Sequence, residues 1–536
     1  MAEYDAVIVG SGINSLACAA LLARAGWGVC VLERNDWLGG AIKTAEITEP
    51  GFRHDVFSAW HPLWVGGAAH ALLGDELAMR GLEYLNTELP TGSCFPDGES
   101  AFLLRSSDSN ATELGVDGSE WRRVVDEFTP NADLSFGLLG TELWSGAGAK
   151  LGAKAARRLG RAGLAEFTGN LFVSSRDWLE TTFAAERTRG LLAPWVLHTG
   201  LGPDAASSGF MTQVIAVALQ EGGMPVPRGG GERLVEALVK LIRDHGGTCE
   251  TGREVDSILV RDGAATGVRT SGGETVEAVR AVIANVTPTQ LYGRLLGNPK
   301  GPVSEAARRF RYGRSEMQIH FALSEPPRWE GDDRLAKTAL VHVTPGLDGV
   351  SRAVNEAERG LLPAEATVVC GQPLTIDPSR APEGKGILWI QLQELPWHVK
   401  GDAAGEIETG DGTWTEALRE RYADRIQARL ARHIPNLDSS ILARTSLSPA
   451  DLEAANPNLH HGDPYGGSLA LDQNFLWRPF PASPGHRTPV DRLWHIGAST
   501  WPGPGLGAGS GTLVAQQLLK VPAVDRIRKR FMRPRR

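Results

Sequence analysis

The fold is decided by YDAVIVGSGINSLACAALLARAGWGVCVLE, residues 4–33 of this 536-residue chain. Residues 4–10 are a short apolar run that fits a buried parallel strand. The apolar residues from Ile13 to Ala25 fit a helix, and Gly26 follows them as a typical C-terminal cap. Residues 29–33 fit a second strand. The stretch therefore predicts a β-α-β unit that opens an α/β, Rossmann-type domain.

The turn between the first strand and the helix predicts a dinucleotide site. Gly10 permits the tight turn, Gly12 lets the backbone approach a pyrophosphate, and the helix N-terminus offers N–H groups and partial positive charge. The third glycine position of the motif is Ser15, which is small enough to keep helix and strand close. Glu33 is placed to accept hydrogen bonds from ribose hydroxyls and would repel a 2′-phosphate. At this point NAD and FAD both remain open, as does an empty Rossmann-like unit.

Composition sets the outer limits. The chain is 42% hydrophobic and 22% charged, as in ordinary globular proteins, and its length predicts two or more structural units. The formal net charge of -8 gives no reason to expect nucleic acid as a partner. No feature of the sequence indicates an oligomeric state.

The five cysteines contain no C-x-x-C pair and no metal-type spacing, so we expect neither a dithiol mechanism nor a bound metal. A cytoplasmic protein is the natural interpretation. The N-terminus reads as a strand and not as a signal peptide. Residues 494–519 carry no Asp, Glu, Lys or Arg, but their prolines and six glycines argue against a spanning helix.

Two basic segments raise the possibility of peripheral membrane contact. Residues 148–164 predict a basic amphipathic helix, which is either a solvated face or an attachment to an anionic membrane. The same alternatives apply to the basic C-terminal tail, residues 521–536.

Beyond Glu33 the sequence resembles a known family. Arg34 follows the glutamate, and the pair Gly39-Gly40 stands six residues after it, followed by Ala41. This E-x(5)-GG arrangement is similar to the FAD signature of the amine oxidase and phytoene desaturase superfamily. Amine oxidases usually place Arg after the glycine pair, so Ala41 resembles the carotenoid-desaturase side.

Further segments resemble the phytoene desaturase-like family in the same order along the chain. Residues 227–242 resemble the loop and helix before the adenine-contacting strand, with Val255 at the contact, and residues 282–288 resemble the strand that returns to the cofactor domain. The segment LWHIGASTWPGPGLGAGSGTLVAQQL resembles the C-terminal flavin motif. The resemblance implies roles at the diphosphate and ribityl chain, and at the pyrimidine end of the flavin, for Gly497, Ala498, Gly505, Leu506 and Gly507.

The resemblance also implies an architecture. We expect a discontinuous FAD-binding domain (1–70, 225–300 and 485–520) of GR2-like Rossmann type, interleaved with an α+β substrate domain (71–224 and 301–484). Because no cysteine lies near 497–507, the FAD is expected to be bound non-covalently. Only one nucleotide fingerprint is present, so O2 or a quinone is the expected electron acceptor.

Candidate catalytic residues are weakly indicated. His61 and His198 are candidates for proton transfer, with His495, Asp55 and Arg53 also open, although a structural role is favoured for each histidine. Five tryptophans fall near motifs or in apolar segments. Each alone fits an ordinary core or interface position, and as a group they favour a large apolar cavity or tunnel for a polyene or aromatic substrate. They are Trp60, Trp64, Trp195, Trp477 and Trp501.

The leading hypothesis is an FAD-dependent oxidoreductase that desaturates a hydrophobic, isoprenoid or polyene-like substrate by hydride transfer. Polyene ketolation or saturation and amine oxidation are the alternatives within the superfamily. A non-catalytic FAD-binding interaction protein is the alternative from another class.

Overall fold

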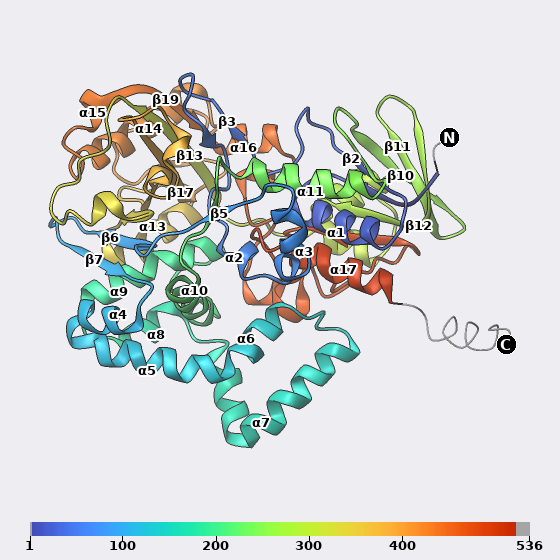
Figure 1. Cartoon of the computed structure of the whole chain (residues 1–536), viewed down its shortest axis with the longest axis horizontal. Coiled ribbons are helices and arrows are strands. Elements are labelled where there is room, and N and C mark those ends of the chain that lie inside the picture. Colours follow the sequence, from blue (N-terminus) through green and yellow to red (C-terminus); the bar gives the residue numbers. More distant parts are fainter. Residues whose placement is uncertain (1–2, 521–536) are drawn as a thin grey trace.

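The computed structural model describes residues 3–520, and two seven-stranded sheets organise it (Figure 1). The first has the order β10-β11-β12-β1-β2-β9, with β20 also paired to β12. Its strands are β1 (Glu3–Val9), β2 (Val29–Leu32), β9 (Thr248–Glu250), β10 (Val255–Arg261), β11 (Ala264–Thr270), β12 (Thr275–Asn285) and β20 (Leu493–Ile496). Strands β20, β12, β1, β2 and β9 run parallel, whereas β10 and β11 form an antiparallel extension. The carboxyl ends of the parallel strands therefore meet at one edge, where open α/β sheets bind ligands.

Helices α1 (Ile13–Arg24), α3 (Ala68–Ala78), α11 (Glu232–Asp244) and α17 (Gly509–Leu519) pack into one apolar core on this sheet. Helix α1 is buried on nearly all sides, because α11 and α17 both pack against it. Its alanines and small polar residues allow these neighbours to approach closely.

The second sheet has the order β19-β13-β17-β16-β14-β6-β7. Its strands are β6 (Thr91–Cys94), β7 (Ser100–Leu103), β13 (Ser315–Leu323), β14 (Leu340–Val343), β16 (Val368–Gly371), β17 (Gly386–Leu395) and β19 (Ile441–Leu447). Met317, Ile319 and Phe321 of β13 pack with α14 (Glu416–Ala431) in one core. The residues between them, Gln318 and His320, point to the other face of the sheet. Their side chains donate hydrogen bonds to the backbone carbonyls of Phe57 and Val56, so this face is turned toward residues 56–57.

A helical layer lies beside the second sheet (Figure 1). It comprises α4 (Ser107–Glu113), α5 (Gly118–Phe128), α6 (Ala132–Leu139), α7 (Gly146–Asn170), α8 (Ser175–Thr182), α9 (Glu186–Leu192) and α10 (Ser208–Gly222). The remaining helices are α2 (Pro62–Val65), α12 (Pro302–Arg308), α13 (Gly346–Glu358), α15 (Leu437–Ser440) and α16 (Pro449–Ala455). Short strand pairs join β3 (Thr44–Ala45) to β4 (His54–Asp55), β5 (Tyr84–Leu85) to β8 (Val226–Pro227), and β15 (Leu361–Leu362) to β18 (Gly401–Asp402).

The prediction of one amphipathic helix over 148–164 is wrong. Gly160, with φ of 66° and ψ of -173°, breaks α7 into two helical halves. The two halves project from the body as a hairpin (Figure 1). Glycine adopts this conformation without the steric penalty that a Cβ would bring, so the chain reverses there.

The predicted α/β fold with a Rossmann-like cofactor sheet is confirmed. Every strand of the first sheet falls within the segments 1–70, 225–300 and 485–520, while the β5–β8 pair crosses from 71–224 to 225–300. The domain boundaries themselves stay a prediction, and the basic tail 521–536 lies outside the described residues. Between residues 3 and 520, no helix has both the length and the apolar character needed to cross a bilayer.

Candidate cofactor site and substrate region

The two glycine pairs predicted to bind the cofactor lie directly against each other. Gly12 and Gly39 form a β-bridge, and a Cβ added to Gly40 would lie 3.0 Å from the Cα of Gly12. Gly39 has φ of 114°, and a Cβ there would lie 2.5 Å from the carbonyl oxygen of Ile42. Gly10, with φ of 84°, completes this bare backbone surface at the end of β1. Side chains are excluded where a pyrophosphate would approach.

Glu33 is buried beside this surface and organises it. Its Oε2 accepts hydrogen bonds from the backbone N–H (2.9 Å) and hydroxyl (2.7 Å) of Ser11, and its Oε1 accepts one from the N–H of Asn35 (2.9 Å). The Ser11 hydroxyl accepts in turn from the N–H of Gly39 (3.0 Å). A carboxylate has about four acceptor sites, so Glu33 retains capacity for a ribose hydroxyl. Arg34 beside it is exposed.

Asn285, at the end of β12, is a residue that sequence reasoning missed. Its side-chain amide donates to the hydroxyl of Ser15 (2.9 Å), and a Cβ on Gly497 would lie 2.4 Å from its Oδ1. The serine at the third glycine position therefore has a specific hydrogen-bond partner. A polar residue at the carboxyl end of the predicted parallel strand VIAN was the signal that could have identified Asn285.

The C-terminal glycine loop brings a second helix N-terminus to the site. The N–H of Gly511, in the first turn of α17, donates to Oδ1 of Asn14 in α1 (3.0 Å), and a Cβ on Gly511 would lie 1.9 Å from the Asn14 carbonyl oxygen. The N–H of Gly497 donates to the hydroxyl of Ser510 (3.1 Å). The positive ends of two helices thus converge, as an anion-binding site requires.

The other predicted contacts in this loop lie against α2. A Cβ on Gly505 would lie 2.5 Å from Cδ1 of Leu63. A Cβ on Gly507 would lie 3.1 Å from the carbonyl oxygen of the same residue. Leu506 is buried, and the carbonyl oxygen of Ala498 accepts a hydrogen bond from the buried guanidinium of Arg478 (2.6 Å). The loop is therefore fixed from both sides.

Val255 and Ala41 lie at the margins of this arrangement. Val255 is buried at the start of β10, two residues after Arg253, whose N–H donates to the carbonyl oxygen of Glu33 (2.7 Å). Ala41 is half-buried, and its carbonyl oxygen accepts from the N–H of Ser58 (3.2 Å). The glycine surface, the acidic Glu33 and the paired helix termini together fit an adenine dinucleotide that lacks a 2′-phosphate.

The histidine candidates are buried and take part in hydrogen bonds. His61 is fully buried, burial lowers its pKa to about 4, and its Nδ1 lies 2.9 Å from the Tyr84 hydroxyl. His495 is also buried, burial lowers its pKa to about 4, and its Nε2 donates to the carbonyl oxygen of Val286 (2.7 Å). Both are neutral at physiological pH.

His198 is paired with His342 of β14 in the substrate region, with 3.1 Å between their Nε2 atoms. Burial lowers the pKa of His198 to about 3, so one neutral ring donates to the other. Trp195 packs on both rings, with centroid separations of 4.6 and 4.9 Å.

Asp55 and Arg53 are held in ion pairs. Asp55 lies 3.0 Å from the guanidinium of Arg380, and both side chains are buried. Arg53 pairs with Glu232 at the start of α11. Among residues 3–520 no three His, Cys, Asp or Glu side chains gather as a metal site would need.

The predicted tryptophans do not form one tunnel. Trp64 belongs to the core of the first sheet. Trp60, Trp195 and Trp501 belong to the core that joins the helical layer to the second sheet. There Gly371 lies between the rings of Trp60 and Trp389, since a Cβ on it would be 2.9 and 3.0 Å from them. Trp477 lines a separate cavity.

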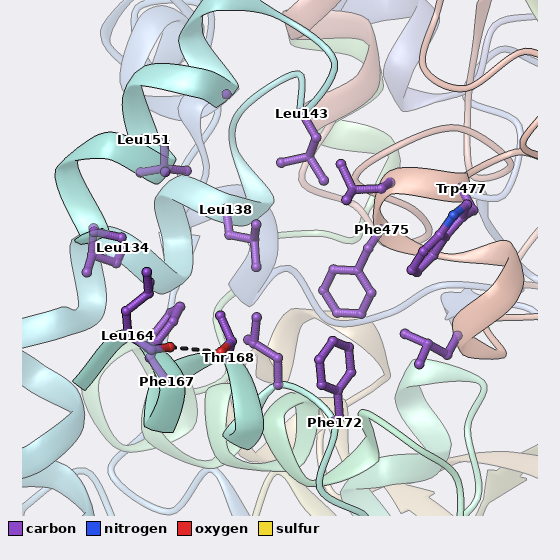
Figure 2. Close-up of a pocket in the computed structure, with 16 residues that line it drawn as sticks. Leu134, Leu138, Leu143, Leu151, Leu164, Phe167, Thr168, Phe172, Phe475 and Trp477 are labelled. Carbon is purple, nitrogen blue, oxygen red and sulfur yellow. Dashed lines mark hydrogen bonds between the residues drawn. The ribbon is translucent and has the colours of Figure 1, made fainter. Parts of the chain in front are cut away.

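That cavity has a volume of about 290 Å³ and lies between α6, the two halves of α7 and residues 471–477. Figure 2 shows leucine side chains of α6 and α7 facing Phe475 and Trp477 across it. Phe475 contacts Trp501, with ring centroids 5.4 Å apart. Since Trp501 follows the Gly497-Ala498 motif in sequence, the apolar cavity adjoins the C-terminal loop of the cofactor site.

Three curated relatives match nearly the whole chain. Pyridine nucleotide-disulfide oxidoreductase domain-containing protein 2 of Rattus norvegicus is 25% identical, covering 95% of this chain and 92% of the relative. A limonene dehydrogenase subunit of Castellaniella defragrans is 24% identical (95% and 93%). A zeta-carotene-forming phytoene desaturase of Myxococcus xanthus is 26% identical (96% and 93%).

Among solved structures, an oxidoreductase from Methanosarcina mazei has a TM-score of 0.62 at 16% identity, covering 96% of this chain and 99% of that one, which shows a shared fold. The model of the flavin-containing amine oxidoreductase family matches residues 16–439. FAD is therefore the cofactor, and the chain is an enzyme. This protein belongs to the flavin-containing amine oxidoreductase family, as a relative of its phytoene desaturases.

Proposed function

We propose that this protein dehydrogenates an apolar, isoprenoid or polyene-like hydrocarbon. The observation that carries the proposal is the apolar cavity between α6 and α7, which adjoins the C-terminal glycine loop through Phe475 and Trp501. FAD supplies the hydride acceptor, its N5 atom. The printed names of two relatives, a limonene dehydrogenase subunit and a phytoene desaturase, support the same substrate class.

The predicted cofactor contacts remain part of this proposal. They are Gly10, Gly12, Ser15, Glu33, Arg34, Gly39, Gly40, Ala41, Val255, Gly497, Ala498, Gly505, Leu506 and Gly507. To these we add Asn285 and the N-terminus of α17. Non-covalent binding is supported by the positions of the five cysteines, which are all buried in segments apart from the 497–507 loop. With a single nucleotide fingerprint in the sequence, O2 or a quinone accepts the electrons.

The chain's own residues orient the substrate and exclude water. The aromatic rings of Trp60, Trp195 and Trp389 form an apolar layer between the second sheet and the helices. Rigid aromatic surfaces of this kind hold a flat conjugated chain without supplying charge. Proton loss from the substrate is not assigned to His61 or His198, because each is held in a hydrogen bond within the protein.

Peripheral contact with an anionic membrane belongs to the same proposal. Lys150, Arg157 and Arg161 on the α7 hairpin are exposed and have no carboxylate partner in the described part of the chain. Lys154 and Arg158, by contrast, pair with Asp133 of α6. Exposed apolar side chains lie close by, among them Trp144 and Phe172. Cations beside exposed aromatic residues are typical of a surface that binds anionic lipid.

The test is anaerobic reduction of the bound flavin by a substrate panel. Purified holoprotein is mixed with acyclic and cyclic isoprenoid hydrocarbons, primary amines and aromatic alcohols, and loss of the oxidised flavin's visible absorbance is followed. We expect hydrocarbons to reduce the flavin and the product to have lost two hydrogen atoms. A product that had gained an oxygen atom, taken from water because O2 is absent, would indicate ketolation. Saturation would show in the converse assay, in which a substrate reoxidises prereduced flavin and gains two hydrogen atoms. Reduction by amines alone would overturn the proposal.

A further inference from the structure

We propose that the cavity between α6 and α7 is the port through which the hydrocarbon substrate reaches the flavin site. The inference rests on the proposed function and names the binding site that feeds it. The cavity of about 290 Å³ is at the lower limit of ligand pockets. It therefore takes one segment of a long chain at a time, while the rest extends outward or toward the flavin.

The lining selects a ligand without polar groups. None of the sixteen lining residues carries a charge. The hydroxyl of Thr168, a polar group in the lining, donates to the carbonyl oxygen of Leu164 (2.8 Å) within α7. That hydroxyl can still accept one hydrogen bond, so a ligand hydroxyl or amine entering here would exchange its hydrogen bonds to water for at most one bond to Thr168. Its binding is therefore disfavoured relative to a hydrocarbon of the same size.

Part of the cavity lining is exposed and apolar. Phe172, Leu476 and Trp477 belong to the lining and are 49%, 40% and 37% exposed. Trp144, on the connection between α6 and α7, is 62% exposed, and its indole N–H donates to the carbonyl oxygen of Leu476 (2.6 Å). Apolar side chains gathered at the rim of an apolar cavity mark a contact surface for lipid or ligand.

Phe475 links the cavity lining to the cofactor loop. This residue has φ of 48°, a strained conformation for a bulky side chain, and its ring lies against Trp501. The indole N–H of Trp501 donates to the carbonyl oxygen of Thr141 (3.0 Å), and Glu142 pairs with His486. The segment between α6 and α7 is thus bonded to the same loop that carries Gly497 and Ala498, so a chain passing Phe475 arrives beside that loop.

The α7 hairpin has few buried residues that would hold it against the rest of the protein. Of the residues in α7, only Ala155 is buried, and Gly160 already interrupts the helix. Few buried contacts mean that opening this element costs little free energy compared with unfolding the core. The salt bridge from Lys154 to Asp133 (2.6 Å) holds the first half of α7 to α6.

The experiment fills the cavity and measures binding of diphenylhexatriene, a rod-shaped conjugated hydrocarbon that fluoresces in apolar surroundings. Ala155→Phe places a ring into the cavity from a buried position, whereas Ala153→Phe adds the same ring at an exposed position on the same helix. Leu151→Phe is a second filling variant at a half-buried lining residue. Flavin content and thermal melting of each holoprotein verify that it is folded.

We expect both filling variants to weaken dye binding by about tenfold or more, and Ala153→Phe to bind like the wild type. Equal dye affinity in all four proteins, equal loss in Ala153→Phe, or no dye binding by the wild type would overturn the proposal. Dye binding does not depend on flavin chemistry. If the dye result holds but no hydrocarbon reduces the flavin, the proposed function fails and the port stands. If hydrocarbons reduce the flavin of Ala155→Phe as fast as that of the wild type, the port fails and the function stands.

Discussion

The cofactor site and the apolar cavity are built in opposite ways. At the cofactor site the surface is backbone, and Gly12, Gly39 and Gly40 approach so closely that a Cβ on Gly39 or Gly40 would meet neighbouring backbone atoms at 2.5–3.0 Å. In the cavity the surface is side chain, supplied mainly by leucine and phenylalanine from α6, α7 and residues 471–477. A backbone surface tolerates few substitutions, whereas an apolar lining accepts many side chains of similar volume. The cofactor site can therefore be recognised in the sequence by a motif, whereas the apolar cavity cannot.

The largest effect that sharpens this contrast is expected from Gly39→Ala. Its φ of 114° and the 2.5 Å approach to the Ile42 carbonyl leave no room for a methyl group. The added methyl group should strain the site by roughly 3 kcal/mol and weaken FAD binding by about a hundredfold. Flavin titration of the apoprotein measures this affinity. Gly26→Ala is the control, because Gly26 has φ of 86° but no atom within 4 Å of its Cβ position. Equal loss of FAD from both variants would mean that backbone strain alone, and not the close approach, sets the effect.

The next largest effect is expected at the α7 hairpin, whose two halves line the cavity. Replacing Lys150, Arg157 and Arg161 by alanine removes three exposed cations from the α7 hairpin. At roughly 1 kcal/mol for each cation near an anionic surface, flotation with anionic phospholipid vesicles should show binding weaker by about a hundredfold. Alanine at Lys240, Lys300 and Lys337, which are exposed elsewhere, is the charge-matched control. An identical loss with the control triple would show that net charge, and not the hairpin, binds the vesicles.

A smaller effect is expected at Glu33. The Glu33→Gln variant loses one of the acceptor oxygens that receive the N–H groups of Ser11 and Asn35. FAD affinity should fall by about tenfold, while an Asp36→Asn variant on the same loop, where the carboxylate is exposed, keeps the wild-type affinity. Unchanged FAD binding in Glu33→Gln would exclude the glutamate from the ribose contact.

The smallest effect concerns pH. Burial lowers the pKa of His61 to about 4, so the unfolded chain binds a proton there at about pH 6.5 that the folded chain does not. The contribution of neutral His61 to the free energy of unfolding is complete above pH 6.5 and is lost as the pH falls toward 4. Relative to the wild type, His61→Gln should therefore gain about 1 kcal/mol on going from pH 7.5 to 5.5, measured by urea unfolding.

His61→Gln also tests a catalytic role. A structural His61 predicts flavin reduction within about tenfold of the wild-type rate, whereas a proton-transfer group would lose roughly a hundredfold or more. A loss of that size with normal flavin content would place His61 in the catalytic machinery.

The contrast also explains what could be predicted from the sequence. The glycines at 10, 12, 39 and 40 predicted the cofactor surface because geometry restricts those positions to one residue type. Asn285 was missed because its role depends on β12 lying next to β1, a long-range pairing. The two-part α7 was missed because a glycine in an amphipathic pattern is usually tolerated. Four glycines fall in residues 148–164, and only Gly160 leaves the helical conformation. The cavity could not be predicted from the sequence, because residues 134–172 and 471–477 come together only in the folded chain.

The decisive experiment is a crystal structure of the holoprotein soaked with a long unsaturated isoprenoid hydrocarbon. We expect FAD against Gly10, Gly12, Gly39 and the 497–507 loop, with hydrocarbon density running from the α6–α7 cavity past Phe475. FAD bound elsewhere, or hydrocarbon reaching the flavin by a path that leaves this cavity empty, would contradict it.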